Sequence, residues 1–178
     1  MIIIYNCLID RMTDKFRIIS FDCGNHHTGV GVADIIPGRE FKLIHVNLHV
    51  DHTKNMVNSL IAFIKMSIEN FVTHQNCIVV YERLLYKNYN LMRIQNKLRD
   101  YFKSISVKTM TLTPKQKSGK IGGKGKERKE KAVAIATDLL MQSDLSGFER
   151  IHDIADAVLS AHYLYEHPEK IKGLKNKA

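Results

Sequence analysis

Residues 17–35 read RIISFDCGNHHTGVGVADI, and this stretch decides the fold that the sequence predicts. Arg17 to Cys23 is an apolar run, rich in isoleucine, that is typical of a buried strand. Gly24 to His27 has the composition of a turn, and Thr28 to Ile35, with glycine at alternate positions, predicts a second strand. Because the connection is short, we expect the two strands to pair antiparallel.

The chain continues with a third strand and then with alternating helices and strands. Residues 41–50 predict that strand, which completes a three-strand antiparallel meander. We expect helices at about 51–74, 90–103, 128–140 and 151–165, and further strands at 77–82 and 106–112. This order predicts an α/β fold in which a mixed five-stranded sheet, the meander plus parallel strands, is flanked by helices.

The length of 178 residues fits one domain with a single core. The predicted elements occupy residues 16–167, which we interpret as that domain. Residues 1–15 are expected to be a loose N-terminal extension, and residues 168–178 a basic, frayed C-terminal tail.

Composition restricts the partner and the compartment. A net charge of +9 favours a polyanionic partner, either nucleic acid or an anionic membrane surface. No stretch has the roughly 20 apolar residues of a membrane span. The three cysteines are odd in number and form no Cys-x-x-Cys pair, and the apolar start lacks a cleavage site. We therefore expect a chain that is not secreted and that works in a reducing environment.

Four acidic residues stand where a sheet and a helix can bring them together. Asp22 ends the first predicted strand and Glu82 ends the fourth, so both emerge at one sheet edge if these strands are parallel neighbours. Asp153 and Asp156 are three residues apart and share one face of the last helix. Four crowded carboxylates repel each other, and a divalent cation relieves the repulsion. Carboxylate oxygens suit Mg²⁺ or Mn²⁺.

Each of these acids also has a simpler interpretation. A carboxylate at a strand end is commonly a solvated cap or turn residue, and Asp153 can complement the dipole of its helix. Only the combination, in this order along the chain, favours a site.

A basic, glycine-rich stretch precedes the last two predicted helices. Residues 113–131 hold eight Lys or Arg and two Glu, a density that suits contacts with nucleic-acid phosphates but also a solvated loop. Nine histidines show no spacing typical of a zinc site, because His26-His27 and His49-x-x-His52 have no obvious partners. The predicted DNA-contacting side chains are Lys115, Lys120, Lys126, Tyr86 and Arg93.

The acids in their context resemble the motifs of the RuvC-like branch of the ribonuclease H-like superfamily, and most of all the poxvirus Holliday junction resolvases. The matching segments are Ser20-Phe21-Asp22-Cys23-Gly24, Val79-Val80-Tyr81-Glu82 and the Asp153-x-x-Asp156 pair. The glycine-containing strand after Asp22 fits as well. The resemblance covers about residues 16–165.

This resemblance implies a homodimeric endonuclease that cuts opposing strands of a four-way (Holliday) junction in viral DNA, in the host cytoplasm. It implies two Mg²⁺ or Mn²⁺ ions held by Asp22, Glu82, Asp153 and Asp156. It also implies a lysine that supports the scissile phosphate, for which Lys117 and Lys124 rank above Lys120. Here the chain departs from a clean match, because several lysines lie in the appropriate loop.

Three alternatives remain open from the sequence. A nuclease of the same superfamily could cut RNA–DNA hybrids or general branched DNA with the same carboxylates. A nucleic-acid-binding module could carry the acids for structural reasons alone. An actin-like phosphotransferase also has a nucleotide loop after an Asp-x-Gly strand, but that fold needs two such domains and a longer chain.

Overall fold

The computed structural model describes residues 15–36, 39–53, 55–72, 76–83, 88–118, 121, 125–140, 148 and 150–175. These residues form a sheet of five strands in the order β3-β2-β1-β4-β5. β1 pairs antiparallel with β2 and β2 with β3, whereas the β1–β4 and β4–β5 pairs are parallel. The predicted mixed sheet, a meander plus parallel strands, is confirmed. The strands are β1 (Phe16–Cys23), β2 (His27–Ile36), β3 (Glu40–Val50), β4 (Cys77–Glu82) and β5 (Lys108–Leu112).

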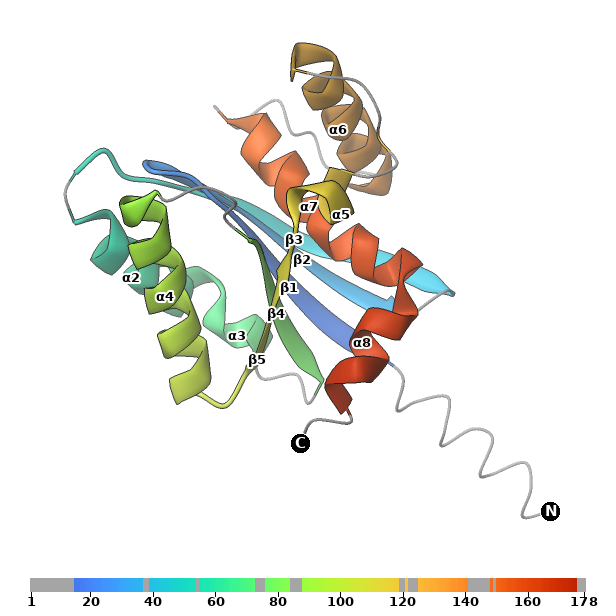
Figure 1. Cartoon of the computed structure of the whole chain (residues 1–178), viewed down its shortest axis with the longest axis horizontal. Coiled ribbons are helices and arrows are strands. Elements are labelled where there is room, and N and C mark those ends of the chain that lie inside the picture. Colours follow the sequence, from blue (N-terminus) through green and yellow to red (C-terminus); the bar gives the residue numbers. More distant parts are fainter. Residues whose placement is uncertain are drawn as a thin grey trace.

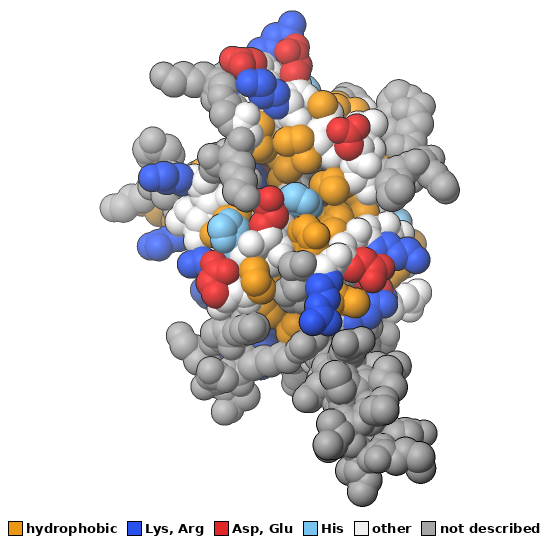
Figure 2. Space-filling model, turned by 90° about the vertical axis from the view of Figure 1, so that its right-hand side faces the viewer, with side chains coloured by type: hydrophobic (Ala, Val, Ile, Leu, Met, Phe, Trp, Pro, Cys, Tyr) orange, Lys and Arg blue, Asp and Glu red, His pale blue; other side chains and the backbone are white. Residues whose placement is uncertain are grey.

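Helices flank the sheet on both faces (Figure 1). One face carries α2 (Met56–Ser67), α3 (Glu69–Val72) and α4 (Tyr89–Ser104). The other carries α5 (Pro114–Ser118), α6 (Gly125–Leu140), α7 (Ile151–Glu166) and α8 (Pro168–Lys175). Figure 2 looks onto this second side, where hydrophobic side chains lie in the middle and lysine and arginine side chains lie around them, at the top, along the left edge and at the lower right. No described helix is both long and apolar enough to cross a membrane.

The central strand β1 is covered on both faces, and its residues from Ile18 to Phe21 are buried. Ile19 and Phe21 pack with the residues of α2 and α4, whereas Ile18 packs with Ala161 of α7 and Ile171 of α8. Alternate residues of a strand point to opposite faces, so a strand buried on both sides is mostly apolar. The position of β1 between β2 and β4 places its end, and therefore Asp22, at the centre of the sheet edge.

The helix expected at about 51–74 is instead two helices. α2 ends at Ser67 and α3 begins at Glu69, and between them Ile68 is fully buried with φ −121°. The change of direction brings Phe71 onto His45 of β3, with ring centroids 5.1 Å apart. Helical spacing alone predicted one continuous helix and did not reveal that the backbone turns at Ile68.

Two further boundaries differ from the predictions. β5 begins at Lys108 rather than Ser106, because Ser106 adopts a left-handed conformation with φ +61° that ends the preceding turn. The tail expected to be frayed from residue 168 forms α8. Pro168 suits the first position of a helix, and the burial of Ile171 in the core holds the segment in place.

Candidate active site

Asp22 and Glu82 end two adjacent parallel strands. Phe21 of β1 lies opposite Tyr81 of β4, so the next residue of each strand emerges at the same edge of the sheet. About a fifth to a quarter of each acid's side chain is exposed, at 20% and 26% respectively. The two carboxylates are therefore accessible from one side and enclosed on the others, as ligand sites at the carboxyl edge of such sheets are.

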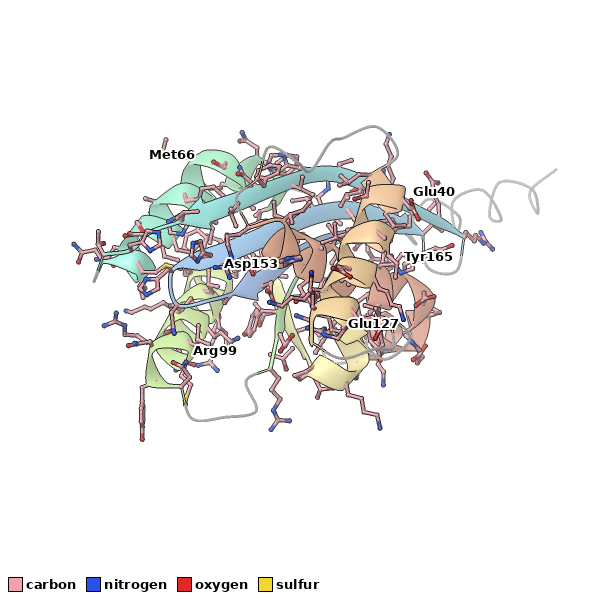
Figure 3. All side chains as sticks on the ribbon, turned by 90° about the horizontal axis from the view of Figure 1, so that it is seen from above. Glu40, Met66, Arg99, Glu127, Asp153 and Tyr165 are labelled. Carbon is pink, nitrogen blue, oxygen red and sulfur yellow. The ribbon has the colours of Figure 1, made fainter. Side chains whose placement is uncertain are left out.

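Two glycines let α7 rest directly on β2. Gly29 is the β2 partner of Asp22, and a Cβ atom at this position would lie 2.1 Å from the backbone oxygen of Asp153. At Gly31 a Cβ atom would lie 3.3 Å from the backbone nitrogen of Val158. Glycine thus permits a helix–strand approach that no other residue allows at position 29. Figure 3 shows Asp153 on the first turn of α7, above the strands.

A short helix, α5, directs a lysine into the site. The Thr113 side chain accepts a hydrogen bond from the Gln116 backbone N–H (3.2 Å), and the Gln116 side chain accepts one from the Thr113 N–H (2.8 Å). This reciprocal capping box, with Pro114 at the first helical position, defines where α5 begins. Lys117 then points inward, and only 4% of its side chain is exposed.

The Lys117 ammonium holds three carboxylates from three separate elements. Its Nζ atom lies 2.9 Å from Asp22 Oδ1 and 3.5 Å from Asp156 Oδ2, and it also contacts Glu82 Oε2. Strand β1, strand β4 and helix α7 therefore converge on one cationic group. Of the lysines predicted to support the scissile phosphate, Lys117 is brought to the acids, whereas Lys120 and Lys124 lie outside the described residues.

The enclosure of the cluster changes how its groups ionise. Burial raises the pKa of the Asp22 carboxyl to about 6, because the Lys117 ammonium, which lowers this pKa, only partly offsets burial and the Asp156 and Glu82 carboxylates. Burial also opposes the charge on Lys117, but its three carboxylate partners outweigh that effect and hold the pKa of the ammonium above its usual range. Lys117 is consequently cationic throughout the physiological range.

Two arginines that the sequence analysis did not single out flank the acids. Arg128 of α6 has a guanidinium nitrogen 3.9 Å from Asp156 Oδ2, and Arg150 Nε lies 3.3 Å from Asp153 Oδ2. The Arg150–Asp153 spacing of three residues is a signal that the sequence contains. The approach of Arg128 depends on how α6 packs against α7, which the sequence does not reveal.

The residues fit a divalent metal in charge and in chemistry. Three carboxylates, those of Asp22, Glu82 and Asp156, face the cationic side chains of Lys117 and Arg128, so this cluster keeps a net negative charge. The Asp153 carboxylate is paired with Arg150 instead. All the oxygen donors are carboxylates, which suit Mg²⁺ or Mn²⁺. Among the described residues, no three His, Cys, Asp or Glu side chains are close enough together to ligate one ion, and the Lys117 ammonium lies between the acids instead.

The predicted DNA-contacting residues are distributed around this edge. Lys115 and Arg93 are exposed, on α5 and at the start of α4. Lys126, at the start of α6, is exposed and lies 3.7 Å from Glu130. Lys120 and Tyr86 lie outside the described residues.

Comparison with solved structures defines the class of fold. The chain has the ribonuclease H-like fold of the RuvC-like Holliday junction resolvases. It is similar to Thermus thermophilus RuvC, with a TM-score of 0.64 and 16% identity over 84% of this chain and 95% of that one. It is similar to the fowlpox virus resolvase, solved with Holliday junction DNA, with a TM-score of 0.62 and 19% identity over 84% of this chain and 97% of that one.

A third similar structure is the yeast mitochondrial Holliday junction resolvase Ydc2, with a TM-score of 0.60 and 13% identity over 90% of this chain and 84% of that one. No protein-family model and no curated protein sequence matches the chain. The likeness to these structures is therefore one of fold.

Proposed function

We propose that this protein is a metal-dependent endonuclease that resolves four-way DNA junctions by paired, symmetric nicks. The observation that carries the proposal is the convergence of Asp22, Glu82 and Asp156, from two strand ends and one helix, on the buried ammonium of Lys117. A cluster this costly in repulsion and desolvation is typical of an active site. The fold supports the junction as substrate, because RuvC and fowlpox resolvase structures of the same fold hold Holliday junction DNA.

The chemistry follows from the roles of the side chains. Asp22, at the centre of the edge, would hold the divalent metal together with Glu82 and the two aspartates of α7. Bound divalent ions supply water activation and stabilisation of the leaving oxygen. In this proposal Lys117 donates hydrogen bonds to the scissile phosphate, and Arg128, 3.9 Å from Asp156, holds that carboxylate in orientation. No protein nucleophile is needed.

We further propose that the protein acts as a homodimer, because two opposed nicks across a symmetric junction require two active sites. We place its work in the reducing cytoplasm of an infected host cell, on viral recombination and replication intermediates. The free thiols of Cys23 and Cys77 and the likeness to the fowlpox virus resolvase support this setting.

A cleavage panel tests the proposed substrate. The full chain is incubated with a synthetic four-way junction, a flapped duplex and an RNA–DNA hybrid, each with Mg²⁺, with Mn²⁺ and with chelator. We expect metal-dependent cutting of the junction in preference to the other two, and loss of cutting with retained junction binding in Glu82→Gln. Cutting of the hybrid alone would instead assign the site to a ribonuclease H activity, and metal-independent binding without cutting would leave only a binding module.

A further inference from the structure

A second cavity opens at the same sheet edge, on the side of α2 and α4. Its volume is about 400 Å³, and it lies between the turn that follows β1, the chain that follows β3 and the first turns of the two helices. It is separate from the cluster around Lys117, which lies under α5 and α7. Its polar lining residues are Asn25, His26, His52, Thr53, Asn90 and Arg93, and three apolar residues of α2 and α4 complete it.

The lining is cationic and rich in hydrogen-bond donors. Arg93 contributes a permanent positive charge, and the rings of His26 and His52 lie 5.3 Å apart between their centroids. The ring of His27 lies edge-on to that of His52, with 5.2 Å between the two ring centroids. The structure thus gathers His26, His27 and His52, three of the four histidines that had no obvious partners in the sequence, although they form no group that could hold a metal ion among the described residues.

No acid among the described residues opposes these groups in the cavity. None of the lining residues is Asp or Glu, and the first turns of α2 and α4 hold no acid. The neighbouring Asp51 borders the cavity through Thr53, but its carboxylate already accepts hydrogen bonds from the Ser59 hydroxyl and from the Thr53 N–H (2.6 Å). The cavity therefore attracts an anion.

The position of the cavity relative to the carboxylates limits what that anion is. Asn25 follows Asp22 by three residues, so their Cα atoms are at most roughly 11 Å apart. A DNA strand that passes the carboxylates can therefore also reach the cavity. On the other side, the Gln95 side chain donates a hydrogen bond to the Glu82 backbone oxygen (2.7 Å) and so ties α4, which carries Arg93, to the end of β4.

We propose that this cavity binds a backbone phosphate of the cut DNA strand, close to the scissile phosphate. The choice of ligand rests on the proposed nuclease function. Arginine, amide and imidazole groups donate to phosphate oxygens, and the apolar residues offer a surface to the adjoining sugar. The cavity exceeds the size of a single phosphate, which favours a phosphodiester within a strand over a free ion. Its role is to fix the register of the strand, not to read sequence.

The test compares two arginines of the same helix. Arg93→Gln removes the charge in the cavity, and Arg99→Gln is its control, because Arg99 is 54% exposed and lies 3.9 Å from Asp100, outside the cavity (Figure 3). Binding of a synthetic four-way junction is measured in chelator over a series of salt concentrations. One lost phosphate contact should lower the slope of log affinity against log salt by about 0.9, which is about eight-fold in affinity at 0.1 M salt.

A second variant tests the histidines. His26→Gln with His52→Gln should weaken junction binding roughly 2–10-fold, because both side chains are exposed and their replacement leaves the core intact. The proposal is overturned if Arg93→Gln binds the junction as Arg99→Gln does. It is also overturned if inorganic phosphate stabilises the wild type through Arg93 while DNA binding is unaffected, since the cavity would then hold a free anion.

The same data separate this inference from the proposed function. If the junction binds through Arg93 but is never cut with Mg²⁺ or Mn²⁺, the phosphate site is supported and the nuclease function is contradicted. If the Arg93→Gln variant cuts the junction and binds it as well as the wild type, the nuclease function is supported and only the phosphate site is contradicted.

Discussion

The ionised form of the Asp22 carboxyl is unfavourable in its enclosed position beside other carboxylates. An unfolded aspartate ionises near pH 3.9, whereas burial and two neighbouring carboxylates raise the pKa of Asp22 to about 6. Its ionised form therefore costs folding free energy, fully so above about pH 6, and this cost disappears as the pH falls below the unfolded value. A residue kept charged at a cost to stability is expected where that charge has a function.

Replacement of Asp22 should separate stability from function. We expect Asp22→Asn to raise the thermal unfolding temperature at pH 7.5 in the absence of metal, because the amide avoids the buried charge. The same variant should lose cleavage and Mn²⁺ binding. Scanning calorimetry at pH 7.5 and 4.0 checks the sign, since the gain should shrink at the lower pH. A variant that is less stable than wild type at pH 7.5 would contradict the account.

The pKa of Asp22 also predicts how metal affinity depends on pH. A divalent ion needs the ionised carboxylate, so Mn²⁺ binding should weaken as the pH falls through about 6 and should release protons in that range. Calorimetric titration at pH 5.5 and 7.5 in buffers of different ionisation enthalpy measures both effects. An affinity that is unchanged between these pH values would show that Asp22 is not a ligand.

The Lys117 ammonium offsets the negative charge of the carboxylates when no metal ion is bound. Lys117→Met should destabilise the metal-free protein by about 3–5 kcal/mol, because it leaves buried acids without their counter-charge. Mn²⁺ should restore more stability to this variant than to the wild type, since the ion no longer competes with the ammonium. Lys115→Met, an exposed neighbour on α5, is the matched control for thermal unfolding with and without Mn²⁺. If Mn²⁺ stabilised Lys117→Met and Lys115→Met equally, the ion and the Lys117 ammonium would not compete for the carboxylates.

At the scale of elements, the site depends on how closely α7 lies on β2. Alternation and apolar runs in the sequence predict the strands, and the parallel β1–β4 pair follows from their buried character. The alternating glycines were visible in the sequence, but their purpose was not. Only the packed structure shows that Gly29 meets the backbone of Asp153.

This contact can be tested by adding one methyl group. A Cβ atom at residue 29 would lie 2.1 Å from a backbone oxygen, whereas at residue 31 its nearest neighbours are a side-chain oxygen at 3.1 Å and backbone at 3.3 Å. We expect Gly29→Ala to displace the start of α7, to destabilise the fold and to abolish cleavage. Gly31→Ala should lower the unfolding temperature and the cleavage rate less than Gly29→Ala does. The reverse order would mean that α7 does not rest on β2 as described.

The helices that were mispredicted have identifiable causes. The Thr113-Pro114-x-Gln116 capping box of α5 is a local signal that was present in the sequence, yet the surrounding lysines and glycines favoured a loop. The turn at Ile68 and the docking of α8 through Ile171 depend on tertiary packing and have no such signal. The same division applies to the site. The meeting of Asp22, Glu82 and Asp156 with Lys117 was predictable from the sequence, whereas the approach of Arg128 and the contact of His26 with His52 depend on the fold.

At the scale of the whole molecule, one sheet edge collects the functional groups from both faces. The carboxylate cluster with Lys117 lies on the side of α5 and α7, and the cationic cavity with Arg93 lies on the side of α2 and α4. A net charge of +9 over the whole chain adds long-range attraction for a DNA strand laid along this edge. Two such edges in a homodimer would face two strands of a junction.

Mapping the nicks on a four-way junction shows whether this protein resolves such junctions. Each strand of a synthetic junction is labelled in turn, and the products formed by the full chain with Mg²⁺ or Mn²⁺ are sized. The account predicts paired nicks at symmetric positions on two opposing strands, which leave two ligatable duplexes, and none in chelator or in Asp22→Asn. Nicks scattered over all four strands, or an Asp22→Asn protein that still cuts, would contradict it.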